Sequence, residues 1–227
     1  MFSIAGIDLL EQELLDHERI LLEILLQDKT TKKNIIWATD DYAELGEPYS
    51  FKKEILPELV TGEQDSLIQP RVEKALEHQT NRTRDKAEVF TPSWICNAQN
   101  NLVDEQWFGR EDVFNIQKEM SWKATADKIA FPDDRQHTWQ KYVDAQRLEI
   151  SCGEAPYLVS RYDTVTGETI PISQRIGLLD RKLRVIGENT DTEEEWFTWT
   201  KRAFQSVYGF EYQGDSLLLV RENLFAN

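Results

Sequence analysis

The stretch "RLEISCGEAPYL", residues 147 to 158, decides the fold that we expect from this sequence. "RLEIS" has the pattern of a short strand, and Gly153 and Pro156 then break it. A glycine turn between a strand and a helix lets the backbone approach a nucleotide-like ligand, and the helix start offers free N–H groups. An ordinary strand-to-helix turn is the alternative interpretation.

The segments after this turn predict a parallel α/β sheet. "SQRIGLLDRKLRVIGEN" and "DTEEEWFTWTKRAFQ" have helical patterns, the second capped by Asp191. "SVYGFEY" is a strand, and "GDSLLLVRENLF" is a final helix capped by Asp215. Strands separated by helices favour parallel pairing. "YDTVTGETI" predicts a hairpin with "TGE" as its turn, which could touch DNA or a partner or be a plain surface hairpin.

The first part of the chain is mostly helical. Between Leu9 and Gln27, leucines recur at helical spacing: Leu10, Leu14, Leu15, Leu21, Leu22 and Leu25. A short buried strand is expected to follow from Ile35 to Ala38. "LIQPRVEKALEHQTNRTRDK", residues 67 to 86, predicts a helix with Pro70 near its start. We therefore expect a helical N-terminal region over residues 1–85 and an α/β region over residues 86–227.

Composition limits the classes of function. The 227 residues include 41 acidic and 26 basic ones, so the net charge of -15 disfavours general affinity for nucleic acid or anionic membrane. The interpretation of the chain as an acidic DNA mimic remains open.

Cys96 and Cys152 are far apart without histidines at metal spacing, so a zinc site is not expected. Acids interrupt the first apolar run, which argues against a signal peptide, and no apolar run is long enough to span a membrane. We expect a reduced, cytoplasmic protein.

Two further segments carry candidate chemistry. In "KAEVFTPSWICNAQNNLVDE", residues 86 to 105, Thr91 is a candidate helix N-cap and Pro92 the first helical residue. The expected buried stripe of this helix is Ile95, Ala98, Leu102 and Val103. In "SVYGFEY" an acid, Glu211, stands at the strand tip, where it could accept hydrogen bonds from both ribose hydroxyls or simply be a solvated strand end.

Taken in order, "AEVFTP", the glycine turn and "YGFE" resemble three motifs of the adenine-specific (amino) DNA methyltransferases of restriction–modification systems. The resemblance covers roughly Arg84 to Asn227 and is closest in style to the methylase subunits. It implies S-adenosylmethionine (SAM) as cofactor and a partial Rossmann-like SAM-methyltransferase sheet, preceded by the helical N-terminal region. In the family, "GEVFTP" folds over the methionine part of SAM, which implies that role for Phe90, Thr91 and Pro92.

The other two motifs imply the rest of a cofactor site. The glycine turn resembles the family's "LDPACGSGNFL": Glu149 stands for the acid that can hold the ammonium group of SAM, and Cys152 and Gly153 match directly. The last motif resembles "IYGYEIDPEALELARENL", which implies that Glu211 binds the ribose and that Tyr212 borders the adenine.

Several departures from the family accompany these matches. Ala155 stands where the family has its second glycine, so a methyl group could occupy space that the ligand needs. The interval between Gly153 and Glu211 is much longer than the roughly 20 residues of a simple nucleotide-binding unit. The catalytic tetrapeptide [N/D]-P-P-[Y/F/W], which orients the flipped base, does not occur, and the chain resembles a methylase truncated before it. No catalytic residue is therefore named.

The resulting hypothesis is a SAM-binding DNA adenine methyltransferase-like subunit, catalytically incomplete alone, that meets DNA together with another chain or a missing C-terminal part. The alternative is a non-enzymatic acidic interaction or decoy protein that binds a restriction complex. Two weaker alternatives are a catalytic strand end at "ATDDY", residues 38 to 42, and a metal-dependent nuclease using Asp133, Asp180 and Lys182.

Overall fold

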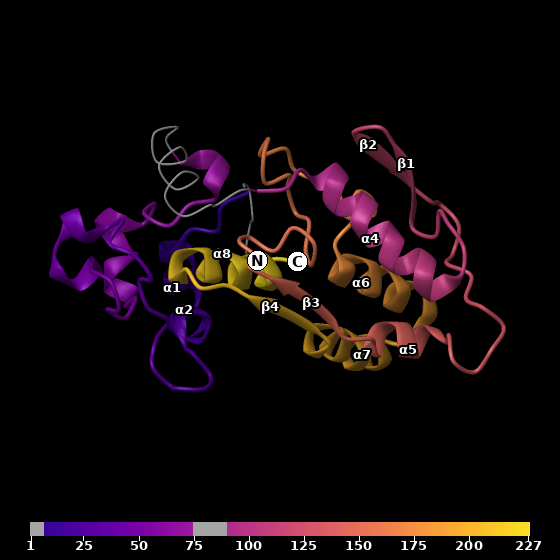
Figure 1. Ribbon diagram of the computed structural model, residues 1–227. Coiled ribbons are helices and arrows are strands. Elements are labelled where there is room, and N and C mark those ends of the chain that lie inside the picture. Colours follow the sequence, from indigo (N-terminus) through magenta and orange to yellow (C-terminus); the bar gives the residue numbers. More distant parts are fainter. Residues whose placement is uncertain (1–6, 75–89) are drawn as a thin grey trace. The chain divides into compact units, whose positions relative to one another are not determined.

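The computed structural model describes residues 7–74 and 90–227, which divide into two compact units. Of the described residues, 7–74 and 211–226 form the first unit, and 90–210 with Asn227 form the second. Helices and small sheets together give a mixed α/β chain (Figure 1). The expected division at residues 85 and 86 did not anticipate that the C-terminal helix groups with the N-terminal unit.

The N-terminal unit begins with two short helices, α1 (Glu11–His17) and α2 (Arg19–Leu26). One continuous helix was expected over this stretch, but Glu18 adopts an extended backbone, with φ -150° and ψ 110°. Leu14 of α1 and Leu22 and Leu26 of α2 are all fully buried in the same core. The break between α1 and α2 thus allows the buried leucines of both helices to pack in the same core.

The segment expected as a buried strand is extended but forms no regular strand. Its backbone pairs with residues 52–55 through a single bridge between Ile36 and Glu54 and through hydrogen bonds such as Trp37 N–H to the Lys53 carbonyl, 2.9 Å. The ring of Trp37 is buried in the unit's core. The expected burial is confirmed for Ile35, Trp37 and Ala38, whereas Ile36 is exposed and no regular strand forms.

Helix α8 (Gly214–Phe225) completes this unit, with Leu218 and Leu219 in the core. A Cβ at Gly214 would lie 2.1 Å from the carbonyl oxygen of Ile36, so only glycine permits this close approach. Asp215, the expected cap, lies inside the helix, because Gln213 occupies the N-cap position. Its carboxylate instead accepts a hydrogen bond from the Tyr42 hydroxyl, 2.9 Å.

The remainder of this unit consists of short 3₁₀ helices joined by turns. Their bounds are Ala43–Leu45, Glu47–Tyr49, Pro57–Leu59, Gly62–Gln64 and Arg71–Glu73. The last of them is the described part of the helix expected over residues 67–86, most of which lies outside the described residues.

The second unit opens with the long helix α4 (Ser93–Phe108), followed by an antiparallel hairpin of β1 (Asn115–Lys118) and β2 (Ser121–Ala124). Helix α5 (Trp139–Asp144) then leads into β3 (Arg147–Ile150). Helices α6 (Leu178–Asn189) and α7 (Glu193–Gln205) precede β4 (Val207–Phe210). The N-cap of α7 is Thr192, whose hydroxyl accepts from the Glu195 amide, and not the expected Asp191.

Strands β3 and β4 pair in parallel, as the sequence predicted, and lie side by side in Figure 1. Leu148 is opposite Tyr208, Glu149 opposite Gly209, and Ile150 opposite Phe210. The two strands form an open sheet of their own within the described residues. The observed architecture is thus a mixed helix-and-strand chain containing one parallel pair.

A polar network, not an apolar stripe, anchors α4. The guanidinium of Arg181, on α6, is buried and donates to Asp104 (2.5 Å) and Asn97 (2.9 Å) of α4. The Tyr142 hydroxyl donates to the same aspartate, 2.9 Å. The expected buried stripe is wrong, because Leu102 is 63% exposed while these polar side chains face inward.

Candidate functional site

The segment Phe90–Pro92 leads directly into α4, and Pro92 occupies its N-cap position. The first free amide of the helix, that of Ser93, donates to the Asp163 carboxylate at 2.7 Å. Thr91, the expected cap, instead offers its carbonyl oxygen to the Thr164 hydroxyl (3.3 Å) and the Cys96 thiol (3.5 Å). A residue about 70 positions away therefore caps this helix, which local sequence could not indicate.

The glycine turn contacts this segment. Gly153 has a left-handed backbone, φ +54°, and a Cβ at this position would lie 3.1 Å from the ring of Phe90. Two of the three sequence motifs, far apart in the chain, are therefore in contact within the second unit. The aromatic ring fills the space that the missing side chain leaves.

The chain after the turn differs from expectation. No helix follows directly, because residues 152–171 form turns and irregular structure before a 3₁₀ helix at Ile172–Gln174 and α6. The expected cradle of helix N–H groups at this turn is therefore wrong. Ala155 also has a left-handed backbone, φ 60°, and is fully buried, so its methyl group packs inside the protein.

Three ionisable side chains lie close together next to the two motifs: Cys96, Glu149 and Tyr157. Burial, with the nearby negative charge of Glu149 adding to its effect, raises the pKa of Cys96 to about 12. Burial raises the pKa of the Tyr157 phenol as well, although its hydrogen bond to Thr91 opposes that shift. The carboxylate of Glu149, half-buried on β3, therefore faces a thiol and a phenol that both remain protonated at neutral pH.

The third motif, "YGFE", consists of the last three residues of β4 and Glu211. Glu211 comes directly after the strand and belongs to the first unit, where its Oε1 accepts the amides of Tyr212 (2.8 Å) and Gln213 (2.9 Å). These bonds hold its carboxylate against its own turn. Tyr212 is 71% exposed and, with Ile36 and Gly214, lines a cavity of about 380 Å³ within that unit.

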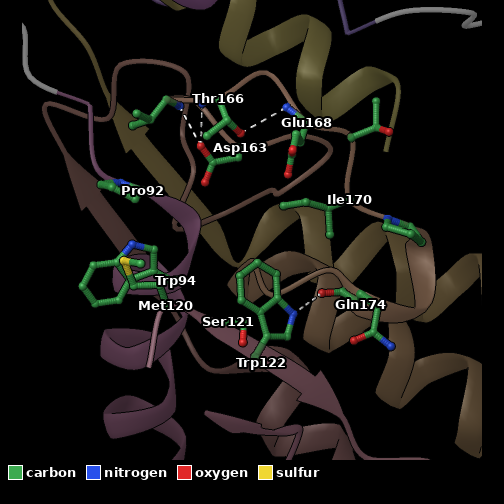
Figure 2. A pocket seen from close by; sticks show the side chains of 13 residues that line it. Pro92, Trp94, Met120, Ser121, Trp122, Asp163, Thr166, Glu168, Ile170 and Gln174 are labelled. Atoms are coloured by element: carbon green, nitrogen blue, oxygen red, sulfur yellow. Dashed lines mark hydrogen bonds between the residues drawn. The ribbon is translucent and has the colours of Figure 1, made fainter. Parts of the chain in front are cut away.

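A separate cavity of about 560 Å³ opens beside the start of α4 in the second unit (Figure 2). Trp94 of α4 and Trp122 of β2 are among its aromatic and apolar walls, with Pro92 and Ile170. Its acidic side comes from the hairpin Tyr162–Ile170, which forms as expected around Gly167 (φ +75°) through a bridge between Tyr162 and Thr169.

The other candidates have structural partners. Asp180 accepts from the Ser160 amide and hydroxyl, and burial raises its pKa. Burial lowers the pKa of Lys182 to about 7, and its amine donates to the Ala145 carbonyl and the Ser206 hydroxyl. In the described ranges, no group of three or more acidic, histidine or cysteine side chains is placed to hold a metal ion. Asp180 and Lys182 thus already have hydrogen-bond partners inside the second unit.

Sequence reasoning missed several residues that build this region. Asp163 was not expected as the cap of α4, and no role was assigned to Tyr157. Trp94 directly follows the "FTPS" segment, and Trp122 lies in β2. Two tryptophans near predicted site residues were the available signal.

Comparison with protein-family models, curated proteins and solved structures gave no match to this chain. Of the helices that the structure describes, none is long and apolar enough to cross a membrane. Function must therefore be inferred from the geometry of the described residues and from the motifs in the sequence.

Proposed function

We propose that the chain is a SAM-binding, DNA adenine methyltransferase-like subunit of a restriction–modification system. The single observation that carries the proposal is the contact between Phe90 and the turn at Gly153. In the family that the sequence resembles, the corresponding segments both border the cofactor. SAM supplies an activated methyl group, and this chain would supply the residues that bind and orient it.

Parallel pairing gives a second line of support. Glu149 is opposite Gly209 in the parallel pair, and the Cys152 amide donates to the Phe210 carbonyl at 3.0 Å. Ligands of open parallel sheets bind beyond the carboxyl ends of the strands. Within the second unit, Gly153 follows the carboxyl end of β3.

Each predicted residue then has a role that its surroundings permit. Glu149 would attract the ammonium group of SAM, since its carboxylate adjoins two groups that stay neutral. Glu211 would accept hydrogen bonds from the ribose hydroxyls, and Tyr212 would border the adenine. Phe90 would restrict water at the methionine end, together with Thr91 and Pro92.

The chain is proposed to act with a second chain, and the exposed face of the parallel pair supports this. Leu148, Ile150, Tyr208 and Phe210 are 52%, 72%, 44% and 63% exposed and lie in register as two pairs. Parallel sheets are normally covered on both faces. A partner that covers this face and carries the catalytic tetrapeptide missing from the sequence would complete a methylase acting on DNA.

Thermal unfolding with and without saturating SAM tests cofactor binding. Ligand at about 100 times its dissociation constant adds roughly 2.7 kcal/mol, which for this chain length corresponds to a midpoint shift of about 5–10 °C. Glu211→Ala should abolish the shift. Each variant is compared with its own midpoint in the absence of SAM. A loss of stability caused by loosening of the Glu211 turn therefore does not affect the SAM-dependent shift.

Glu58→Ala is the matched control, since Glu58 is an exposed acid in the same unit. It should retain the full SAM-dependent shift. The absence of a shift in the folded wild-type protein, or an equal shift in Glu211→Ala, would contradict the proposed cofactor site.

The second candidate is an acidic decoy that binds a restriction complex, favoured by the net charge of -15. A gel shift at two salt concentrations distinguishes the candidates. Binding through phosphate contacts weakens steeply as salt rises. A decoy would not shift DNA at either salt concentration, but it would compete with DNA for a restriction complex.

A further inference from the structure

The cavity between α4, the β1–β2 hairpin and the 162–170 hairpin has the composition of a cation-binding pocket. Its walls contain two indole rings, Trp94 and Trp122, and its acidic residues are Asp163 and Glu168. Among the described residues that line it, none is a lysine or an arginine. The negative charge of Asp163 and Glu168 would repel a phosphate-bearing ligand such as a nucleotide, and no described lysine or arginine of the lining would offset that repulsion.

The aromatic wall is held in a defined position. The Trp122 indole N–H donates to the Gln174 carbonyl at 2.7 Å, and the Gln174 side chain accepts from the Ala124 amide at 3.0 Å. These two bonds tie the β1–β2 hairpin to the 3₁₀ helix at Ile172–Gln174. In the view of Figure 2, Trp94 and Trp122 lie at different sides of the cavity, and Asp163 and Glu168 lie above them.

The acidic wall has a fixed negative charge. Asp163 accepts hydrogen bonds from the amides of Ser93 (2.7 Å), Val165 (2.9 Å) and Thr166 (2.8 Å). These bonds hold the pKa of the carboxyl group below its ordinary value although partial burial opposes them. Both carboxylate oxygens are thus occupied by backbone donors, while the charge itself remains.

We propose that this cavity binds a quaternary ammonium group. Such a cation has no N–H donors, so it needs only negative charge and aromatic faces nearby. A guanidinium would instead pair with carboxylate oxygens that are free for two hydrogen bonds. Those of Asp163 already accept backbone amides, which leaves only Glu168 at the exposed rim for such a pair. The cavity shares Pro92 with the proposed SAM site, but binding a cation there does not require methyltransferase activity.

Calorimetric titration with choline and with 3,3-dimethylbutan-1-ol, its neutral isostere, tests the proposal. The two probes have the same shape and differ in charge. Choline should bind saturably in the millimolar range, and the neutral probe about tenfold more weakly or not at all. Equal affinities, or no choline binding by the folded protein, would overturn the assignment.

Variants locate the binding site. Trp94→Leu should weaken choline binding about tenfold, and Glu168→Gln, an exposed rim change, by a few-fold. Trp139→Leu is the control, because this indole packs against Trp199 away from the cavity. Unchanged binding in Trp94→Leu would refute the site. Displacement of choline by SAM would show instead that the cavity is part of a cofactor site.

Discussion

Glu11 provides the sharpest test of the packing of the first unit. Its side chain is 1% exposed, and burial raises its pKa from 4.5 to about 11, with the charge of Glu222 adding to the effect. The folded protein therefore keeps a proton on Glu11 that the unfolded chain releases above pH 4.5. The change that tests this is Glu11→Gln, which replaces the acid by a neutral group of the same shape.

The expected gain in stability follows from the difference in proton binding. At pH 7.5 the unfolded carboxyl is three pH units above its pKa of 4.5, which corresponds to an upper limit of about 4 kcal/mol. This penalty is absent below pH 4.5 and grows as pH rises toward the folded-state pKa. Glu11→Gln should thus stabilise the first unit at pH 7.5 by up to this amount and have little effect at pH 4.

Urea unfolding at a series of pH values between 4 and 8, followed by circular dichroism, measures the difference. Glu13→Gln is the control, because Glu13 is exposed on the same helix, and it should change the free energy of unfolding by less than about 0.5 kcal/mol throughout. A gain from Glu11→Gln that does not change with pH would refute a protonated Glu11 in the folded state.

Three further predictions concern the second unit. Asp104→Ala should destabilise it by about 3–5 kcal/mol in urea unfolding, because the buried guanidinium of Arg181 loses its counter-charge. Gly153→Ala should lower the thermal midpoint more than Gly109→Ala, since both glycines are left-handed but only the first has an aromatic ring 3.1 Å from the new Cβ; equal losses would contradict that contact. Cys96 should resist alkylation at pH 8 until the protein unfolds, since burial raises its pKa to about 12, and rapid labelling of the native protein would exclude this environment.

The sequence predicted the elements whose signals are local. Strands β3 and β4 follow from short β-type runs ended by turn residues, and their parallel pairing follows from the helices between them. The hairpin around Gly167 was likewise predicted from its turn residues. In the first unit, the leucine pattern identified Leu14 and Leu22 as buried, but it missed Leu26 and the break at Glu18.

Elements that depend on distant partners were not predictable from local pattern. The expected cap at Thr91 was wrong because Asp163, from the later hairpin, accepts the Ser93 amide. The stripe on α4 was wrong because Arg181 draws polar side chains inward, whereas hydrophobic periodicity assigns them to solvent. Asp215 looked like a cap but lies within α8, where its carboxylate bonds to Tyr42.

Among the candidate site residues, the contact between the "FTP" segment and the glycine turn could be expected from the family resemblance alone. The roles of Glu149, Glu211 and Tyr212 remain predictions. The tryptophan cavity was not foreseen, because its walls come from three segments whose meeting is a property of the fold.

The most direct test of the central claim is a calorimetric titration of the purified chain with SAM, repeated with the Glu211→Ala variant. The wild-type chain should bind SAM saturably, near one molecule per chain, and the variant should lose this binding or bind at least tenfold more weakly. Absence of binding by a demonstrably folded protein, or equal affinity in Glu211→Ala, would contradict a cofactor site built from these motifs.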